Sequence, residues 1–269
     1  MTRRRSETVL ARRIVDEGRT DEGRRPDEVI VEEPLEIRLD GNVVGTTMRT
    51  PGHDFELAAG LCFTDGLLGD ATIETCRYCG TGSAVETEFN VVSIDTGGRA
   101  PEPTPRLGMV SSSCGVCGST QIDDLTARLS PVAAHAPWDR AVMFGVVDAI
   151  RDHQDLFDRT GGVHAAAAFD REGSMLVVRE DIGRHNAVDK VVGNLLLDGR
   201  LPATGLGLFV SGRASFEMVQ KAWAGGFELL VSVSAPSALA VQVTQAAGMT
   251  LAGFVRDGAF NIYTAPGGA

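Results

Sequence analysis

Residues 206–223 read LGLFVSGRASFEMVQKAW, and this stretch decides the fold. An apolar run at 206–210 gives way to a short polar loop at 211–215, and apolar residues then return at Phe216, Val219 and Trp223. The first pattern predicts a buried strand and the second an amphipathic helix. The stretch therefore predicts one strand–loop–helix unit.

Two similar units flank this one. A strand expected at 175–179 is followed by the loop 180–186 and a helical pattern, and a strand expected at 229–233 is followed by the loop 234–237 and another helical pattern. Strands that alternate with helices form a largely parallel sheet with helices on its faces. The sequence therefore predicts an α/β fold whose loops meet at the carboxyl ends of the strands, where such folds bind ligands.

The rest of the chain suggests three parts. Residues 1–26 lack hydrophobic periodicity over much of their length and predict a mobile basic tail. Residues 27–135 predict a smaller α+β domain with strands within 29–40 and at 89–95, a helix starting near Asp54, and a mobile loop at 111–120. A linker at 134–138 leads into the α/β domain at 136–269, which opens with a helix at 137–157 and closes with a hairpin at 254–263.

Charge and hydropathy exclude several function classes. The net charge is −11, and because residues 1–26 carry eight Arg and five acidic residues, the remainder carries −14, which argues against nucleic-acid binding. No run of eighteen apolar residues predicts a membrane span, and no signal-peptide pattern follows the N-terminus. We therefore expect a cytoplasmic protein without a membrane or nucleic-acid partner.

Four of the five cysteines form two C-x-x-C pairs, Cys76/Cys79 and Cys114/Cys117. The second pair lies among small residues, and its spacing lets one thiol attack while the other resolves the intermediate. A sulfur or thiol function is one interpretation, and a dithiol oxidoreductase is another. The third is a zinc-ribbon interaction module in which all four cysteines bind the metal. Cys62 is expected to be a core residue.

Three loops combine helix N-termini with small or cationic residues, which suits a phosphate-bearing ligand. The residues expected to bind it are Arg184, His185, Ser211, Gly212 and Arg213. No P-loop motif is present. The stretch around His164 lacks the glutamate and the following C-x-x-C of zinc deaminases, so we expect no deaminase chemistry. His164 itself is either a ligand contact or a hydrogen-bonded core residue.

Taken in order, six stretches resemble the formate dehydrogenase accessory sulfurtransferase family, FdhD. They are EPLEIRL at 33–39, MRTPGHD at 48–54, SSCGVCG at 112–118, TGGVHA at 160–165, EDIGRHNAVDK at 180–190, and the segment from SGR at 211–213 to APS at 235–237. The resemblance implies a carrier that takes sulfane sulfur from a cysteine desulfurase onto Cys114 as a persulfide, with Cys117 assisting. It implies transfer to the molybdenum bis(molybdopterin guanine dinucleotide) cofactor needed by formate dehydrogenase.

The resemblance also implies a cytidine-deaminase-like C-terminal domain, a homodimer and a cofactor-binding stretch near the C-terminus. That stretch comprises Phe254, Val255, Arg256, Asp257, Gly258 and Ala259. Phe254, Arg256 and Gly258 keep the family pattern, whereas Val255 and Ala259 depart from it. GDP is the expected mimic of the cofactor, and no resident metal is expected.

Overall fold

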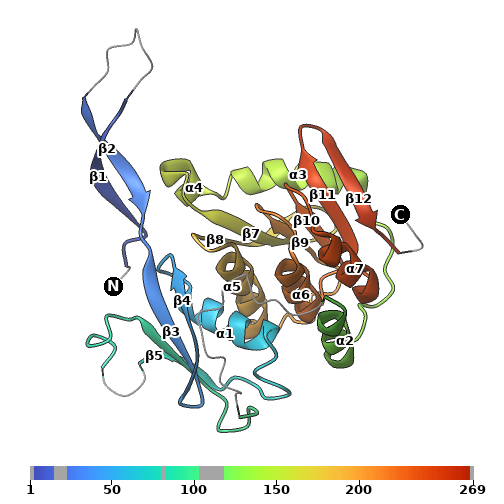
Figure 1. Cartoon of the computed structure of the whole chain (residues 1–269), viewed down its shortest axis with the longest axis horizontal. Helices are drawn as coiled ribbons and strands as arrows, with labels where there is room; N and C mark the ends of the chain where they lie inside the picture. The colour runs from blue at the N-terminus through green and yellow to red at the C-terminus, as the bar shows by residue number, and fades with distance from the viewer. Residues whose placement is uncertain (1–2, 15–22, 80–82, 103–117, 267–269) are drawn as a thin grey trace.

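The structure is a computed structural model that describes residues 3–14, 23–79, 83–102 and 118–266. Its strands are β1 (Ser6–Arg12), β2 (Arg24–Ile30), β3 (Glu33–Leu39), β4 (Asn42–Arg49), β5 (Thr75–Tyr78), β6 (Val91–Asp95), β7 (His164–Phe169), β8 (Met175–Asp181), β9 (Gly207–Val210), β10 (Leu229–Ser232), β11 (Thr250–Arg256) and β12 (Ala259–Thr264). Its helices are α1 (Asp54–Thr64), α2 (Gly118–Arg128), α3 (Arg140–Arg151), α4 (Asp155–Thr160), α5 (Arg184–Leu197), α6 (Phe216–Gly225) and α7 (Ala238–Ala247). Figure 1 shows their arrangement.

The larger sheet has six strands in the order β12-β11-β10-β9-β7-β8. Strands β9, β10 and β11 pair in parallel, while β7 is antiparallel to both of its neighbours and β12 is antiparallel to β11. The strand β8 therefore runs in the same direction as β9. The prediction of an α/β fold is confirmed, with β7 as an additional strand that the sequence patterns did not indicate.

Helices cover both faces of this sheet (Figure 1). Ala166 and Ala168 of β7 belong to the core shared with α5, α6 and α7, whereas Ala165 and Ala167 belong to the core shared with α3. Successive side chains of a strand point to opposite faces, so this alternation follows directly from the pleat. Four alanines in a row also leave room for a helix to approach each face closely.

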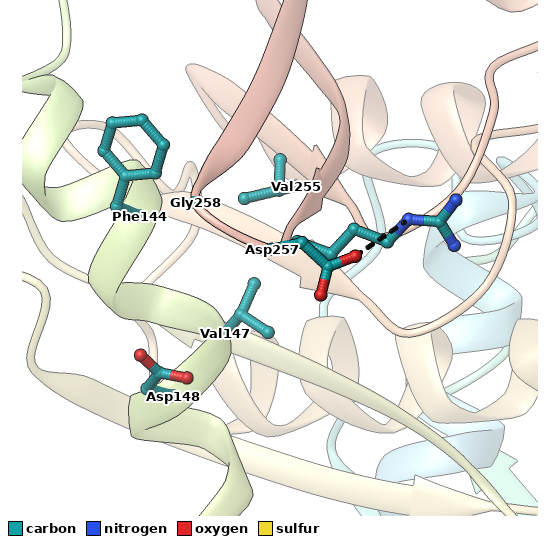
Figure 2. A pocket seen from close by; sticks show the side chains of 7 residues that line it. Phe144, Val147, Asp148, Val255, Asp257 and Gly258 are labelled. Atoms are coloured by element: carbon teal, nitrogen blue, oxygen red, sulfur yellow. Dashed lines mark ion pairs between the residues drawn. The ribbon is translucent and has the colours of Figure 1, made fainter.

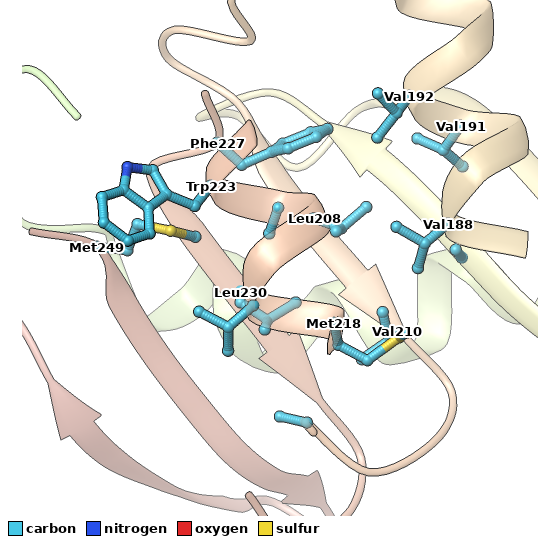
Figure 3. Packing of buried hydrophobic residues seen from close by; sticks show 14 of the residues in the cluster. Val188, Val191, Val192, Leu208, Val210, Met218, Trp223, Phe227, Leu230 and Met249 are labelled. Atoms are coloured by element: carbon cyan, nitrogen blue, oxygen red, sulfur yellow. The ribbon is translucent and has the colours of Figure 1, made fainter. Parts of the chain in front are cut away.

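The core beneath α5 and α6 is tightly filled (Figure 3). Val188 and Val191 of α5 are fully buried, and so are Leu208 of β9 and Leu230 of β10. Trp223 of α6 is buried as well, and its indole N–H donates to the carbonyl of Ser130 at 2.8 Å. Burial of large apolar side chains such as these contributes about 1.5–3 kcal/mol each, which makes this face a main source of stability.

A second sheet of four strands, in the order β4-β3-β6-β5, lies in the N-terminal half. Leu35 and Ile37 of β3 and Val92 of β6 are fully buried with Leu57 of α1. The helix α1 packs against α5 of the larger sheet. One helix therefore serves the cores of both halves.

Two buried lysines connect these halves. Lys190 lies 2.6 Å from Asp181, and its ammonium donates to the carbonyl of Thr50 at 3.0 Å. Lys221 donates to the hydroxyl of Thr64 at 2.9 Å. The ion pair with Asp181 fixes the ammonium of Lys190 within the large domain, and the hydrogen bonds to Thr50 and Thr64 connect both lysines to the N-terminal elements. A buried ammonium group that loses a partner is strongly destabilising, so these contacts stabilise the packing of the two halves.

Within residues 1–26, where the sequence predicts a mobile tail, the described residues include strand β1 and the start of β2. The strands β1 and β2 form an antiparallel ribbon that extends from the body (Figure 1). Its base is anchored because Arg5 donates to the carbonyl of Glu180 at 3.4 Å. The two strands pair from Ser6 opposite Ile30 to Arg12 opposite Arg24. Most of these residues are exposed, so no hydrophobic alternation in the sequence indicated the pairing.

The helix predicted at 137–157 is divided into α3 and α4, since the chain turns between Asp152 and Gln154. Residues 129–139 form neither helix nor strand and include the predicted linker. The closing hairpin is confirmed by β11 and β12. Among the described residues, no helix combines the length and apolar character needed to cross a bilayer.

Candidate functional site

A pocket of about 640 Å³ lies at the edge of the large sheet where the parallel strands end. Ile182 follows β8, Ser211 follows β9, Val233 follows β10 and Arg256 ends β11, and all four line the pocket. This edge is where ligands bind in open α/β sheets. The opposite wall comes from α3, α4 and the loop after α4, with Val147, Ile150, Arg151, Gln154, Phe157, Gly161 and Gly162.

The carboxylate of Glu180 positions α4 beside the pocket. It accepts hydrogen bonds from the backbone N–H groups of Leu156 at 3.0 Å and Phe157 at 2.8 Å. These N–H groups lie in the first turn of the helix, where no intrahelical acceptor exists. A negative charge also interacts favourably with a helix N-terminus. Glu180 therefore connects the end of β8 to the wall that Phe157 contributes.

His164 and Ser211 meet inside the pocket. The Nδ1 atom of His164 lies 3.3 Å from the Oγ atom of Ser211, and Ser211 Oγ accepts the backbone N–H of Ala165 at 2.9 Å. Burial, together with the positive charge of Arg184, lowers the pKa of His164 from its ordinary 6.5. His164 is therefore a neutral, half-buried imidazole at neutral pH rather than a cation.

The turn between β11 and β12 separates this pocket from a second hollow of about 370 Å³. Figure 2 shows the second hollow between Phe144, Val147 and Asp148 of α3 and the turn that carries Asp257. Arg256 and Asp257 line both spaces. Asp257 adopts a left-handed backbone conformation with a φ of 53°, and the side chains of Arg256 and Asp257 are both exposed at this turn. The turn can therefore contact a ligand that extends over both hollows.

The predicted stretch 254–259 contributes to these spaces unequally. Val255, Arg256, Asp257 and Gly258 line the second hollow. Val255 is only 1% exposed and packs in the core, so its side chain has little surface for a ligand. Phe254 lies outside both linings, and its ring is 5.8 Å from the guanidinium of Arg256. Ala259 begins β12 and lines neither hollow.

The structure brings only part of the other predicted anion-binding set together. Gly212 lies beside His164 and Arg184, because a Cβ atom at Gly212 would be 3.7 Å from the His164 ring and 3.8 Å from Arg184 Cδ. Arg184, His185 and Arg213 do not line the pocket. Burial and the charges of Arg184 and Lys221 lower the pKa of His185 to about 4, so His185 provides no positive charge at neutral pH.

Three polar side chains that line the pocket were not among the predicted binding residues. Arg151 and Gln154 come from the junction of α3 and α4, and His164 begins β7. The single helix expected at 137–157 included Arg151 and Gln154, but its pattern marked neither as a binding residue. The TGGVHA stretch was the available signal for His164, although sequence alone did not distinguish a pocket residue from a core residue.

Cys114 and Cys117 lie outside the residues that the structure describes. Cys76 lies on β5, packed against the core of the N-terminal half. Burial raises the pKa of the Cys76 thiol to about 11, which disfavours the thiolate that metal binding requires. Within the described ranges, no group of three or more potential metal-binding side chains occurs.

Comparison with known proteins shows the family of this chain. The FdhD/NarQ family profile matches residues 30–268. The chain belongs to the FdhD/NarQ family. Two relatives named sulfur carrier protein FdhD are each 46% identical to this chain. The alignment with the protein from Mycolicibacterium paratuberculosis covers 89% of this chain and 91% of that protein. The alignment with the protein from Corynebacterium efficiens covers 89% of this chain and 90% of that protein.

A solved structure extends the comparison to three dimensions. The crystal structure of a formate dehydrogenase accessory protein from Desulfotalea psychrophila has a TM-score of 0.77 and 26% identity to this chain. The match covers 98% of both chains. The structural similarity therefore extends over the N-terminal sheet as well as the large sheet that carries the pocket.

Proposed function

We propose that this FdhD/NarQ protein is a cytoplasmic sulfurtransferase. It takes sulfane sulfur from a cysteine desulfurase and passes it to molybdenum bis(molybdopterin guanine dinucleotide), the substrate destined for formate dehydrogenase. The observation that carries the proposal is the joint presence of the family match and a pocket with two arginines at the ligand-binding edge of the sheet. A homodimer with a cytidine-deaminase-like C-terminal fold is part of the same proposal.

The first step loads the carrier. The thiolate of Cys114 attacks the outer sulfur of the desulfurase persulfide, forming a sulfur–sulfur bond at Cys114 and breaking the one on the donor. The donor cysteine leaves as a thiolate, so no net oxidation occurs. Cys114 then holds the sulfane sulfur as a persulfide.

The second step delivers the sulfur. The thiolate of Cys117 attacks the inner sulfur of the Cys114 persulfide and forms a Cys114–Cys117 disulfide. The outer sulfur leaves with two electrons as sulfide and becomes a ligand of the substrate's metal. The two cysteines supply these two electrons and are themselves oxidised to the disulfide, so a cellular dithiol must reduce it before another cycle.

The pocket supports the recognition of a nucleotide-bearing substrate. Arg151 and Arg256 supply positive charge, Gln154 supplies an amide, and Gly161 and Gly162 leave their backbone accessible. Arginine binds phosphate oxygens with short, charge-assisted hydrogen bonds. A volume of about 640 Å³ suits one nucleotide-sized part of the substrate.

Sulfur loading is tested by intact-mass analysis after incubation with a cysteine desulfurase and cysteine. The wild-type chain should gain about 32 Da as cyanide-labile sulfur, and Cys114→Ala should gain none. Cys117→Ala should still load sulfur but fail to release it. Cys62→Ala, which removes a core thiol, serves as the control for nonspecific sulfur uptake.

Delivery is tested in cells that lack the endogenous accessory protein. Wild-type protein should restore formate dehydrogenase activity, and Cys114→Ala should not. Full activity with Cys114→Ala would exclude Cys114 as the carrier. Stoichiometric zinc that is lost in both Cys76→Ser and Cys114→Ser would instead support the zinc-ribbon interpretation.

A further inference from the structure

We propose that His164 binds the substrate's phosphate as a neutral Nε2–H donor, and that Ser211 holds the imidazole in this tautomer. The proposal rests on the proposed nucleotide pocket and assigns a binding role to a residue that the motif comparison left open. The relevant geometry is the contact between His164 Nδ1 and Ser211 Oγ at 3.3 Å, at the point where β9 ends.

The position of Ser211 is determined by the strand beside it. The backbone N–H of Ser211 donates to the carbonyl of Ala165 at 2.9 Å, and the backbone N–H of Ala165 donates to Ser211 Oγ, also at 2.9 Å. These two bonds extend the pairing of β7 and β9 by one step. The hydroxyl of Ser211 is therefore held beside the first residue of β7.

The hydroxyl proton needs an acceptor. In the part of the chain that the structure describes, the acceptor beside Ser211 Oγ is His164 Nδ1. A neutral imidazole that accepts at Nδ1 carries its proton on Nε2. The bond from Ala165 to Ser211 and the bond from Ser211 to His164 then run in one direction, toward the imidazole.

The surroundings of the ring favour this arrangement. Gly212 packs against the ring edge that carries Nδ1 and Cε1, since its Cβ position would be 3.7 Å from both atoms. His164 lines the pocket, and its contact with Ser211 is made through Nδ1, so our proposal assigns Nε2 to the pocket side. The neighbouring Arg184 disfavours a second proton on the ring, which agrees with the lowered pKa of His164.

A neutral donor suits this pocket because Arg151 and Arg256 already provide positive charge. An N–H group of fixed direction adds orientation rather than charge. A phosphate oxygen fits this donor because it accepts hydrogen bonds and cannot donate one when ionised. The ligand class is therefore a nucleoside diphosphate or the equivalent end of a larger dinucleotide.

The tautomer is tested by ¹⁵N NMR on the full chain labelled at histidine, with the His164 signals assigned by their loss in His164→Gln. The expected spectrum has a pyrrole-like Nε2 and a pyridine-like Nδ1. In Ser211→Ala the two signals should move toward those of a mixed population. A pyrrole-like Nδ1 in the wild-type chain would overturn the assignment.

The contact is tested by titrating GDP into the wild type, His164→Gln, His164→Asn and Ser211→Ala. The amide nitrogen of Gln takes the place of Nε2, whereas that of Asn takes the place of Nδ1. We expect about tenfold weaker binding for His164→Asn and Ser211→Ala, and no more than about threefold weaker binding for His164→Gln. His153→Gln and His153→Asn, at an exposed histidine outside the pocket lining, should bind as the wild type does.

The outcomes separate the two proposals. Equal GDP binding by His164→Asn, His164→Gln and the wild type would reject the His164 contact and leave the pocket assignment intact. Equal weakening by both substitutions, in chains with wild-type melting temperature, would reject the Nε2 donor in favour of a packing role. Absence of GDP binding by the wild type would reject the nucleotide pocket itself, while sulfur loading of Cys114 would still be measured independently.

Discussion

Gly60 of α1 and Gly193 of α5 face each other where the two helices cross. A Cβ atom at Gly60 would lie 1.9 Å from the carbonyl oxygen of Asp189, and one at Gly193 would lie 1.8 Å from that of Glu56. Both obstructing atoms belong to backbones, so neither can move without moving a helix. The contact between the two halves of the molecule therefore depends on two hydrogen atoms in place of side chains.

Gly60→Ala and Gly193→Ala should each destabilise the fold by about 3 kcal/mol or more, because inserting a methyl group here forces α1 and α5 apart. Urea denaturation measures the change. Gly145→Ala is the matched control: Gly145 lies in α3 with nothing within 4 Å of its Cβ position. Alanine there should be neutral or stabilising by about 0.5–1 kcal/mol. A wild-type midpoint for Gly60→Ala would contradict the close crossing.

The ion pair between Glu56 and Arg179 should make the free energy of unfolding fall at acidic pH. Burial alone would raise the pKa of Glu56, but two hydrogen bonds from Arg179, at 2.5 and 2.7 Å, and the contact with His53 lower it to about 2. A lowered pKa in the folded state adds stability that is present above 4.5, the ordinary value, and is lost as the pH falls toward 2.

Glu56→Gln should therefore lose about 1–3 kcal/mol at pH 7 and show a shallower loss of stability between pH 4.5 and pH 2 than the wild type. Denaturant midpoints measured across this range check the prediction. The exposed Glu32→Gln should retain the wild-type profile. Parallel profiles for Glu56→Gln and the wild type would exclude Glu56 as a source of the acid sensitivity.

GDP should raise the melting temperature, since a ligand that binds only the folded state at about 100 times its dissociation constant stabilises by roughly 2.7 kcal/mol. Arg256→Ala and Arg151→Ala should each weaken GDP, because both side chains line the pocket. Arg200→Ala removes an exposed arginine outside the lining and should have no effect. A shift with adenine nucleotides but not with GDP would argue against the guanine-bearing substrate.

The Cys76 thiol should react slowly. Its raised pKa, about 11, and its packing against the N-terminal core leave little thiolate at neutral pH. In native protein, Cys114 should label with a maleimide much faster than Cys76, as followed by mass spectrometry of peptides. In urea, where the fold is lost, Cys76 and Cys114 should label at similar rates. Similar rates for the two cysteines in the native protein as well would show that burial does not protect Cys76.

The sequence by itself determined the α/β class, because strand and helix periods alternate from residue 175 to residue 247 and these short-range patterns reflect which side chains must be buried. It also determined the closing hairpin and the family, through ordered motifs that include the cysteines. The strand β7 escaped prediction because a run of alanines at 165–168 has no apolar alternation, although the strand is buried on both faces.

The tertiary structure decided the site. Arg256 is far from Arg151 and His164 in the sequence, yet all three line one pocket. His164 reaches it because β7 runs antiparallel to β9, so the first residue of β7 lies at the edge where the parallel strands end. Arg213, which the loop pattern favoured, is exposed outside the pocket lining. Local sequence sets which residues can bind a phosphate, but strand direction and helix packing set which of them face the same space.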